Sequence, residues 1–175
     1  KGAFAKTGNI GYFLRFVTKL AEEFGNDLKY VITINEPNIY ISYREISGTW
    51  VSVPPDYSLI RRLLMYFRLI KTHKMTYLIL KKANPKLQIG AAVHMAENKP
   101  KTPKFLSKLA VYVADRFGNY FYYDRLKRHM DFIGFNYYFT NYFDGLKLKF
   151  PSSPKSDLGL YMEPSAVAEV AIKLW

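Results

Sequence analysis

The sequence has 175 residues, of which 49% are hydrophobic, so it can build one domain with a real core and is not a disordered chain. It contains no cysteine, which excludes disulfide bonds and thiolate metal sites and fits a reducing compartment or a hot habitat. We therefore expect a cytoplasmic protein, and the composition would suit a thermophile.

The formal net charge of +12 is typical of proteins that bind nucleic acids or membrane surfaces. The basic residues are dispersed along the chain, however, and a solvated helix face is the simpler interpretation of their densest group, Lys71, Lys74, Lys81 and Lys82. No apolar run approaches the length of a membrane span, and no signal peptide is visible. We expect neither a nucleic acid nor a membrane as a partner.

Apolar residues recur at helical spacing from Ile10 to Phe24, which predicts an amphipathic helix with Asn9 as its N-cap and Gly25 as its terminator. A strand, Tyr30–Ile34, follows, and residues 39–57 are expected to form a long loop.

The remainder of the chain alternates in the same way. A helix from Ser58 to Lys82 is stopped by Asn84-Pro85, and Pro164 is expected to open the last helix. Between them we predict a strand over Leu87–Val93 with His94 at its end, helices over 104–117 and 120–128, a strand over Phe132–Tyr138, and a loop over 139–160.

Strands that alternate with helices predict an α/β protein with a parallel sheet covered by helices. The three predicted strands are too few to close a (β/α)₈ barrel, which takes eight.

Val31–Ile34 is a β-branched run suited to a buried parallel strand, and the residues directly after it are polar or break a strand. Asn35, Glu36 and Pro37 come next, and Pro37 must end the strand. A carboxylate at the carboxyl end of such a strand lies where α/β enzymes place catalytic groups. The alternative is a solvated glutamate at an ordinary strand end.

Residues 33–38 (TINEPN) resemble the acid/base motif of the family 1 glycoside hydrolases, which include β-glucosidases and β-galactosidases. Residues 131–138 (DFIGFNYY) and 156–164 (SDLGLYMEP) resemble two further motifs of that family, in the family's order, and archaeal-type members are the most similar. The resemblance implies a (β/α)₈ barrel of which residues 1–175 form a single segment, roughly strands four to six with flanking helices, incomplete at both ends.

By the same resemblance, Glu36 is the general acid/base of a retaining β-glycosidase acting on terminal β-D-glucosides or galactosides. Asn35 would contact the sugar 2-hydroxyl, and Tyr138 would position the nucleophile. Asn136 lies two residues from Tyr138, on the same face of its strand, and is also expected to bind substrate. Retaining enzymes need a second carboxylate about 5–5.5 Å from the first. The family supplies it from Thr-Glu-Asn-Gly, which has no match in this sequence.

The histidines suggest no metal site, and neither a metal nor a cofactor is expected. We interpret His73 as structural, His94 as a possible lining of the sugar cleft and His129 as a surface residue. Tyr137, between Asn136 and Tyr138, should pack against helices.

Two other functions stay open on the sequence. The chain could be a non-catalytic sugar-binding or scaffold remnant of the barrel, as the missing nucleophile suggests. It could also be a basic nucleic-acid binder, although no motif supports this. The partners we expect are a small saccharide and either the remaining barrel segments or further copies of the chain.

Overall fold

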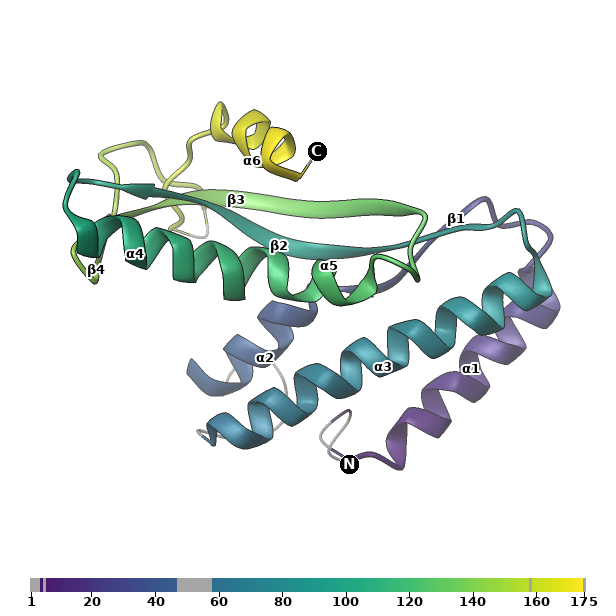
Figure 1. Ribbon diagram of the computed structural model, residues 1–175. Coiled ribbons are helices and arrows are strands. Elements are labelled where there is room, and N and C mark those ends of the chain that lie inside the picture. The colour runs from purple at the N-terminus through teal and green to yellow at the C-terminus, as the bar shows by residue number, and fades with distance from the viewer. Residues whose placement is uncertain (1–3, 5, 47–57, 158, 175) are drawn as a thin grey trace. The chain divides into compact units, whose positions relative to one another are not determined.

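The computed structural model describes residues 4, 6–46, 58–157 and 159–174, which form an α/β protein (Figure 1). In chain order the elements are α1 (Asn9–Phe24), β1 (Tyr30–Asn35), α2 (Pro37–Ile46), α3 (Leu59–Ala83), β2 (Gln88–Pro100), α4 (Phe105–Val113), the π-helix η2 (Ala114–Tyr120), α5 (Phe121–Leu126), β3 (Phe132–Asp144), β4 (Lys147–Lys149) and α6 (Ala166–Leu174).

The strands form one sheet in the order β1-β2-β3-β4. β1 pairs with β2 in parallel, as the alternation of helices and strands predicted, whereas β3 and β4 pair antiparallel through a tight turn at Gly145. The sheet is open among the described residues, which agrees with part of a barrel. The short strand β4 was not predicted from the sequence.

The chain divides into two compact units. Unit 1 comprises residues 1–93 and 122–134, and unit 2 comprises residues 94–121 and 135–175. The chain passes from one unit to the other three times, within β2, at the start of α5 and within β3.

The core of unit 1 lies where α1 and α3, side by side in Figure 1, cover the start of β2. It contains Val17 and Ala21 of α1, Leu80 of α3, and Leu87 and Ile89. Gly90 follows in the same strand, and a Cβ atom there would lie 2.6 Å from the Phe132 carbonyl oxygen. The backbones of β2 and β3 can approach this closely only because the residue is glycine.

The long helices of unit 1 confirm the periodicity argument, although their caps differ in detail. Ser58 caps α3, and its side chain accepts a hydrogen bond of 3.4 Å from the backbone of Arg61. Asn9, expected as an N-cap, is instead the first residue of α1, and the capping position falls on Gly8. In unit 2, α6 begins at Ala166 rather than at Pro164, which lies in the preceding turn.

The largest corrections concern strand lengths and loops. β2 and β3 each have 13 residues, so His94, Asn136 and Tyr138 lie within strands and not at their ends. The β-favouring residues of 139–143 (FTNYF) continue β3 where we expected a loop. Residues 39–46 belong to α2, and the remainder of that predicted loop, 47–57, lies outside the described residues.

Candidate active site

Glu36 forms the junction between β1 and α2. Its backbone N–H donates to the carbonyl of Ala92 on β2 (2.7 Å), and its own carbonyl accepts from the N–H of Tyr40 (3.0 Å). Pro37 then begins the helix, in a position where a missing N–H costs nothing. Glu36 therefore ends one element and starts the next, and its side chain is half-buried.

The backbone of Glu36 has a φ of 50°, and no other non-glycine residue among those described has a positive φ. This left-handed conformation is strained for a residue with a Cβ atom, and such strain concentrates at functional sites. The sequence motif alone does not reveal this conformation.

An irregularity in the pairing of β1 with β2 lies just before this junction. Ile32 pairs with Gly90 and Asn35 pairs with Ala92, so three steps along β1 correspond to two along β2. An extra residue of this kind bends a strand and re-aims the side chains that follow it. Asn35, which follows the bulge, is exposed.

The bulge is anchored through Thr33 and His73. The His73 Nε2 lies 2.6 Å from the carbonyl oxygen of His129, which can only accept, so Nε2 carries the proton. The Thr33 hydroxyl then donates to the His73 Nδ1 at 2.5 Å. Burial lowers the pKa of His73 to about 4, which keeps the ring neutral and this arrangement fixed at neutral pH. The structural interpretation of His73 is confirmed.

Asp131, the first residue of the second motif, holds the beginning of the sheet together. Its carboxylate accepts from the Lys81 ammonium (2.8 Å), the Ile89 N–H (2.9 Å) and the Tyr77 hydroxyl (3.1 Å). Burial alone would raise the pKa of Asp131, but these bonds outweigh it and lower the pKa. Lys81 is thus a structural partner of Asp131, which corrects its assignment to a solvated face.

His129 is not a plain surface residue. Its ring is half-buried and meets the ring of Tyr77 edge-on, at 5.7 Å between centroids. Burial lowers the pKa of His129.

In unit 2, the ring of His94 stacks on the ring of Tyr138, with 5.4 Å between centroids and 14° between planes. Tyr138 is 44% exposed, and Asn136 is half-buried. Tyr137 was expected to pack against helices, but its hydroxyl donates to the Glu163 carbonyl (2.9 Å) in the non-helical segment before α6.

A cavity of about 500 Å³ brings the second and third motifs together in unit 2. Tyr138 contributes one wall, and the third motif contributes the carboxylates of Asp157 and Glu163. Both carboxylate oxygens of Glu163 accept from the Tyr142 hydroxyl at 3.1 Å. The remaining lining is largely apolar and consists of Tyr137, Ser156, Leu160, Met162, Pro164 and Val167.

The predicted site residues lie on two strands, one in each unit. Asn35 and Glu36 share the end of β1 in unit 1, and Asn136 and Tyr138 share β3 in unit 2. A carboxyl group at a strand end can exchange a proton with a bound molecule, and amide and aromatic side chains can bind hydroxyls and ring faces.

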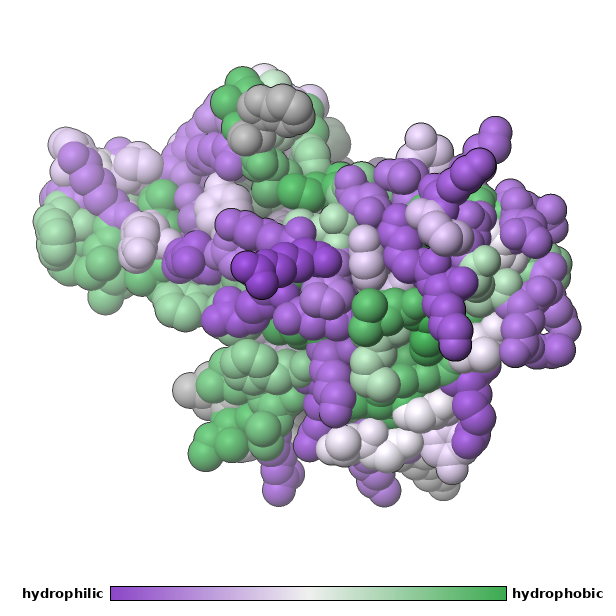
Figure 2. Space-filling view, turned by 45° about the vertical axis from the view of Figure 1, so that its right-hand side comes forward, coloured by the Kyte–Doolittle hydropathy of each residue, from purple (hydrophilic) through white to green (hydrophobic). Residues whose placement is uncertain are grey.

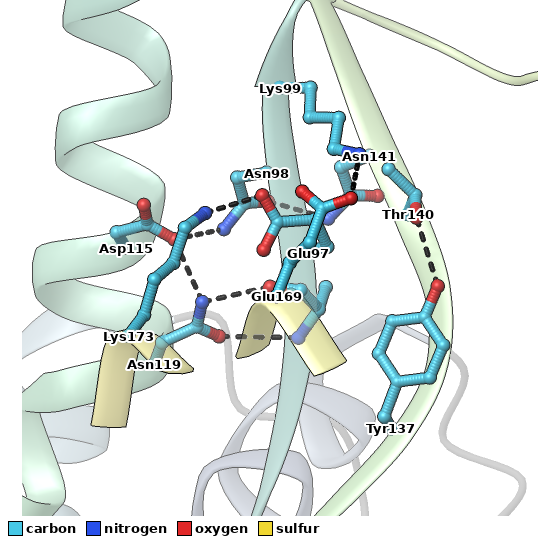
Figure 3. Close-up of polar contacts among 11 residues, drawn as sticks. Glu97, Asn98, Lys99, Asp115, Asn119, Tyr137, Thr140, Asn141, Glu169 and Lys173 are labelled. Carbon is cyan, nitrogen blue, oxygen red and sulfur yellow. Dashed lines mark hydrogen bonds and ion pairs between the residues drawn. The ribbon is translucent and has the colours of Figure 1, made fainter. Parts of the chain in front are cut away.

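A polar network in unit 2 was missed from the sequence (Figure 3). Asp115 accepts hydrogen bonds from the side-chain amides of Asn98 (2.7 Å) and Asn119 (2.8 Å). The Asn119 side chain also donates to the carbonyl of Ala96 and accepts from its N–H. Buried Glu97 pairs with Lys173 of α6. The spacing of Asp115 and Asn119 signals one helix face, but their partners lie in the part of β2 after Val93, where no strand was predicted.

The described residues contain no group of three or more His, Asp or Glu side chains that could hold a metal ion. None of the helices in this part of the chain is long and apolar enough to cross a membrane.

A family model described as Glycosyl hydrolase family 1 matches residues 1–128. A rice protein (Oryza sativa subsp. japonica), Beta-glucosidase-like SFR2, chloroplastic, is 22% identical over 98% of this chain. The chain covers 28% of that relative's length.

Solved structures share the fold. A hyperthermophilic β-glucosidase mutant that forms a dodecamer in its crystal has a TM-score of 0.86 at 22% identity, and covers 98% of this chain. Thermotoga maritima β-glucosidase in complex with glucoimidazole has a TM-score of 0.86 at 19% identity. Pyrococcus horikoshii β-glycosidase has a TM-score of 0.84 at 22% identity, and each of these two matches covers 99% of this chain. The chain spans 41%, 47% and 45% of those three chains, respectively. The order of its motifs, its open α/β sheet and the family match together show that this chain belongs to glycosyl hydrolase family 1.

Proposed function

We propose that the chain forms part of a retaining β-glycosidase that hydrolyses terminal β-D-glucosides or galactosides, with Glu36 as the general acid/base. Asn35, Asn136 and Tyr138 are the residues proposed to bind the sugar. The observation that carries the proposal is the conformation of Glu36, a strained carboxylate residue at the carboxyl end of a parallel strand, directly after a bulge.

The sequence contains no Thr-Glu-Asn-Gly, the family's nucleophile motif. Since retaining hydrolysis needs two carboxylates, we propose that residues 1–175 act as one segment of a (β/α)₈ barrel. The remaining segments would come from the same protein or from associated chains, and the 175 residues alone should not hydrolyse glycosides. A cytoplasmic location remains a prediction from the cysteine-free sequence.

Titration of the isotopically labelled chain with glucose tests the binding half of the proposal. The side-chain amide signals of Asn35 and Asn136 should shift in NMR spectra, while that of Asn84, which caps α3, should not. Shifts confined to the Lys71–Lys82 helix on addition of DNA, with no response to sugar, would contradict the proposal. Binding of sugar without hydrolysis by any assembled form would favour the scaffold alternative.

A further inference from the structure

Unit 2 carries a helical segment whose polarity is the reverse of an ordinary surface helix. Along α4 and η2 the buried residues are Ser107, Ala110 and Asn119, which are small or polar. Six large apolar residues point outward instead, and they are here called the α4 face: Phe105, Leu106, Leu109, Tyr112, Val113 and Phe117. Phe105 is 75% exposed and Tyr112 64% exposed. A surface helix normally turns its large apolar residues toward the core. Figure 2 shows that hydrophobic residues gather in patches on the surface of this molecule.

Hydrogen bonds fix this orientation. The Ser107 hydroxyl accepts from the Gly145 N–H (2.8 Å) and bonds the Thr102 hydroxyl (2.9 Å). Asp115 and Asn119 are tied to β2 by the network drawn in Figure 3. Turning the α4 face inward would break these bonds and bury its large side chains in space that is filled by small ones.

The surroundings of the α4 face are basic. Exposed Lys104 is the N-cap residue of α4 and pairs with Asp144 at 3.9 Å, and Lys108 is exposed in the first turn of the helix. The β3–β4 turn reaches the start of α4 through Gly145, and exposed Leu146, Lys147 and Lys149 follow it. Asp115 is the only acidic residue between positions 105 and 120, and it is engaged by the network. Asp144 offsets Lys104, which leaves Lys108, Lys147 and Lys149 as the basic surroundings of the face.

We propose that the α4 face binds the surface of an anionic membrane. Aromatic and aliphatic side chains on one side of a helix, flanked by lysines, are typical of helices that lie in the interface between lipid headgroups and acyl chains. The lysine stems cover apolar surface while their ammonium groups meet anionic headgroups. This binding is peripheral and does not depend on the glycosidase function, and it replaces our expectation from the sequence that no membrane is a partner.

The charges favour this occupant over a second copy of the chain. A two-fold contact between α4 faces would bring the basic surroundings of both copies, Lys108, Lys147 and Lys149 from each, into one interface. An anionic lipid surface complements those charges, which are repelled in the self-contact.

Vesicle flotation of the full chain tests the proposal, because bound protein rises with the vesicles while aggregated protein sinks. The chain should float with vesicles of phosphatidylcholine and phosphatidylglycerol, less with phosphatidylcholine alone, and less at high salt. The double variant Phe105→Ser/Tyr112→Ser should lower the partition coefficient at least about tenfold, because two inserted rings are lost. Lys104→Gln/Lys108→Gln should lower it about tenfold for anionic vesicles only.

Ile172→Ser is the matched control, because Ile172 is also 75% exposed but lies on α6. It should float as the unchanged chain does, and circular dichroism should show that all variants are folded. Failure of the chain to float with anionic vesicles would overturn the proposal, as would flotation of the Phe105/Tyr112 double variant at the unchanged level. Without flotation, self-association lost in that variant would assign the α4 face to contacts between copies, and retention on DNA would assign it to a nucleic acid.

Discussion

His73 and Asp131 in unit 1 are held in a different way from Glu97 in unit 2. In unit 1, both ring nitrogens of His73 are bonded, and Asp131 accepts three hydrogen bonds. In unit 2, Glu97 pairs with Lys173, but its other carboxylate oxygen, Oε2, is buried without a hydrogen-bond partner. His73 fixes the strand that leads to Glu36 through Thr33, and Asp131 fixes the start of β2 to α3. The incompletely satisfied group of unit 2 joins α6 to β2 at a cost in desolvation.

Of the substitutions that test this difference, substitution of His73 should lower the free energy of unfolding most. His73→Ala removes two hydrogen bonds and leaves a cavity at a fully buried position, so we expect a loss of about 4 kcal/mol. Hydrogen exchange of the backbone amides of unit 1 at increasing urea concentrations measures this loss of stability. Lys71→Ala, at an exposed position of the same helix, is the control and should cost less than about 0.5 kcal/mol. Equal effects of the two substitutions would remove the basis of the comparison.

Acid should destabilise unit 1 through the same residue. The folded pKa of His73 is about 4, below its ordinary value of 6.5, so the unfolded chain takes up the proton first. The stabilisation is full above pH 6.5 and is lost as the pH falls toward 4, by about 3 kcal/mol in all. Urea unfolding at a series of pH values should show this slope, and His73→Gln should flatten it. A slope unchanged in His73→Gln would assign the titration to other groups.

A double-mutant cycle sharpens the comparison for unit 2. Lys173→Met leaves the Glu97 carboxylate buried and unpaired, and should cost about 2 kcal/mol because Lys173 is partly exposed. Combining it with Glu97→Gln should recover part of that loss, because the uncompensated charge is gone. If the double variant loses the sum of the two single effects, the pair is not coupled.

The smallest effect is expected at the bulge. Thr33→Val keeps the shape of the side chain but removes the hydroxyl that donates to His73, and should cost about 1 kcal/mol. Thr18→Val in α1 is the control, because the Thr18 hydroxyl bonds only within its own helix. Proton exchange at the His73 ring, followed by NMR, should become faster in the first variant and stay unchanged in the second.

The sequence was most informative where periodicity or proline controls the backbone. The apolar spacing within α1 and α3 predicted both helices, and Pro37 marked the end of β1 because it cannot continue a sheet. No proline or glycine follows Val93 or Tyr138 directly, so nothing local marked where those strands end, and both were predicted too short.

Other features depend on partners distant in sequence. The bulge before Asn35 is a property of the register with β2, and the strain at Glu36 follows from joining that strand to α2. The amphipathic pattern of residues 105–117 predicted a helix but not the side it buries, because small residues rather than large ones face the sheet. The three site motifs could be located in the sequence, whereas the anchors Thr33 and His73 required coordinates.

The role of Glu36 is tested most directly by Glu36→Gln in a protein that contains this chain together with the remainder of a family 1 barrel. Hydrolysis rates are compared for an alkyl β-glucoside, whose leaving group needs protonation, and an activated aryl β-glucoside, whose leaving group does not. If Glu36 is the general acid/base, Glu36→Gln should lower the hydrolysis rate of the alkyl substrate about 10²- to 10⁴-fold. It should slow bond cleavage in the aryl substrate much less. Equal losses on both substrates would contradict the assignment of Glu36 as the general acid.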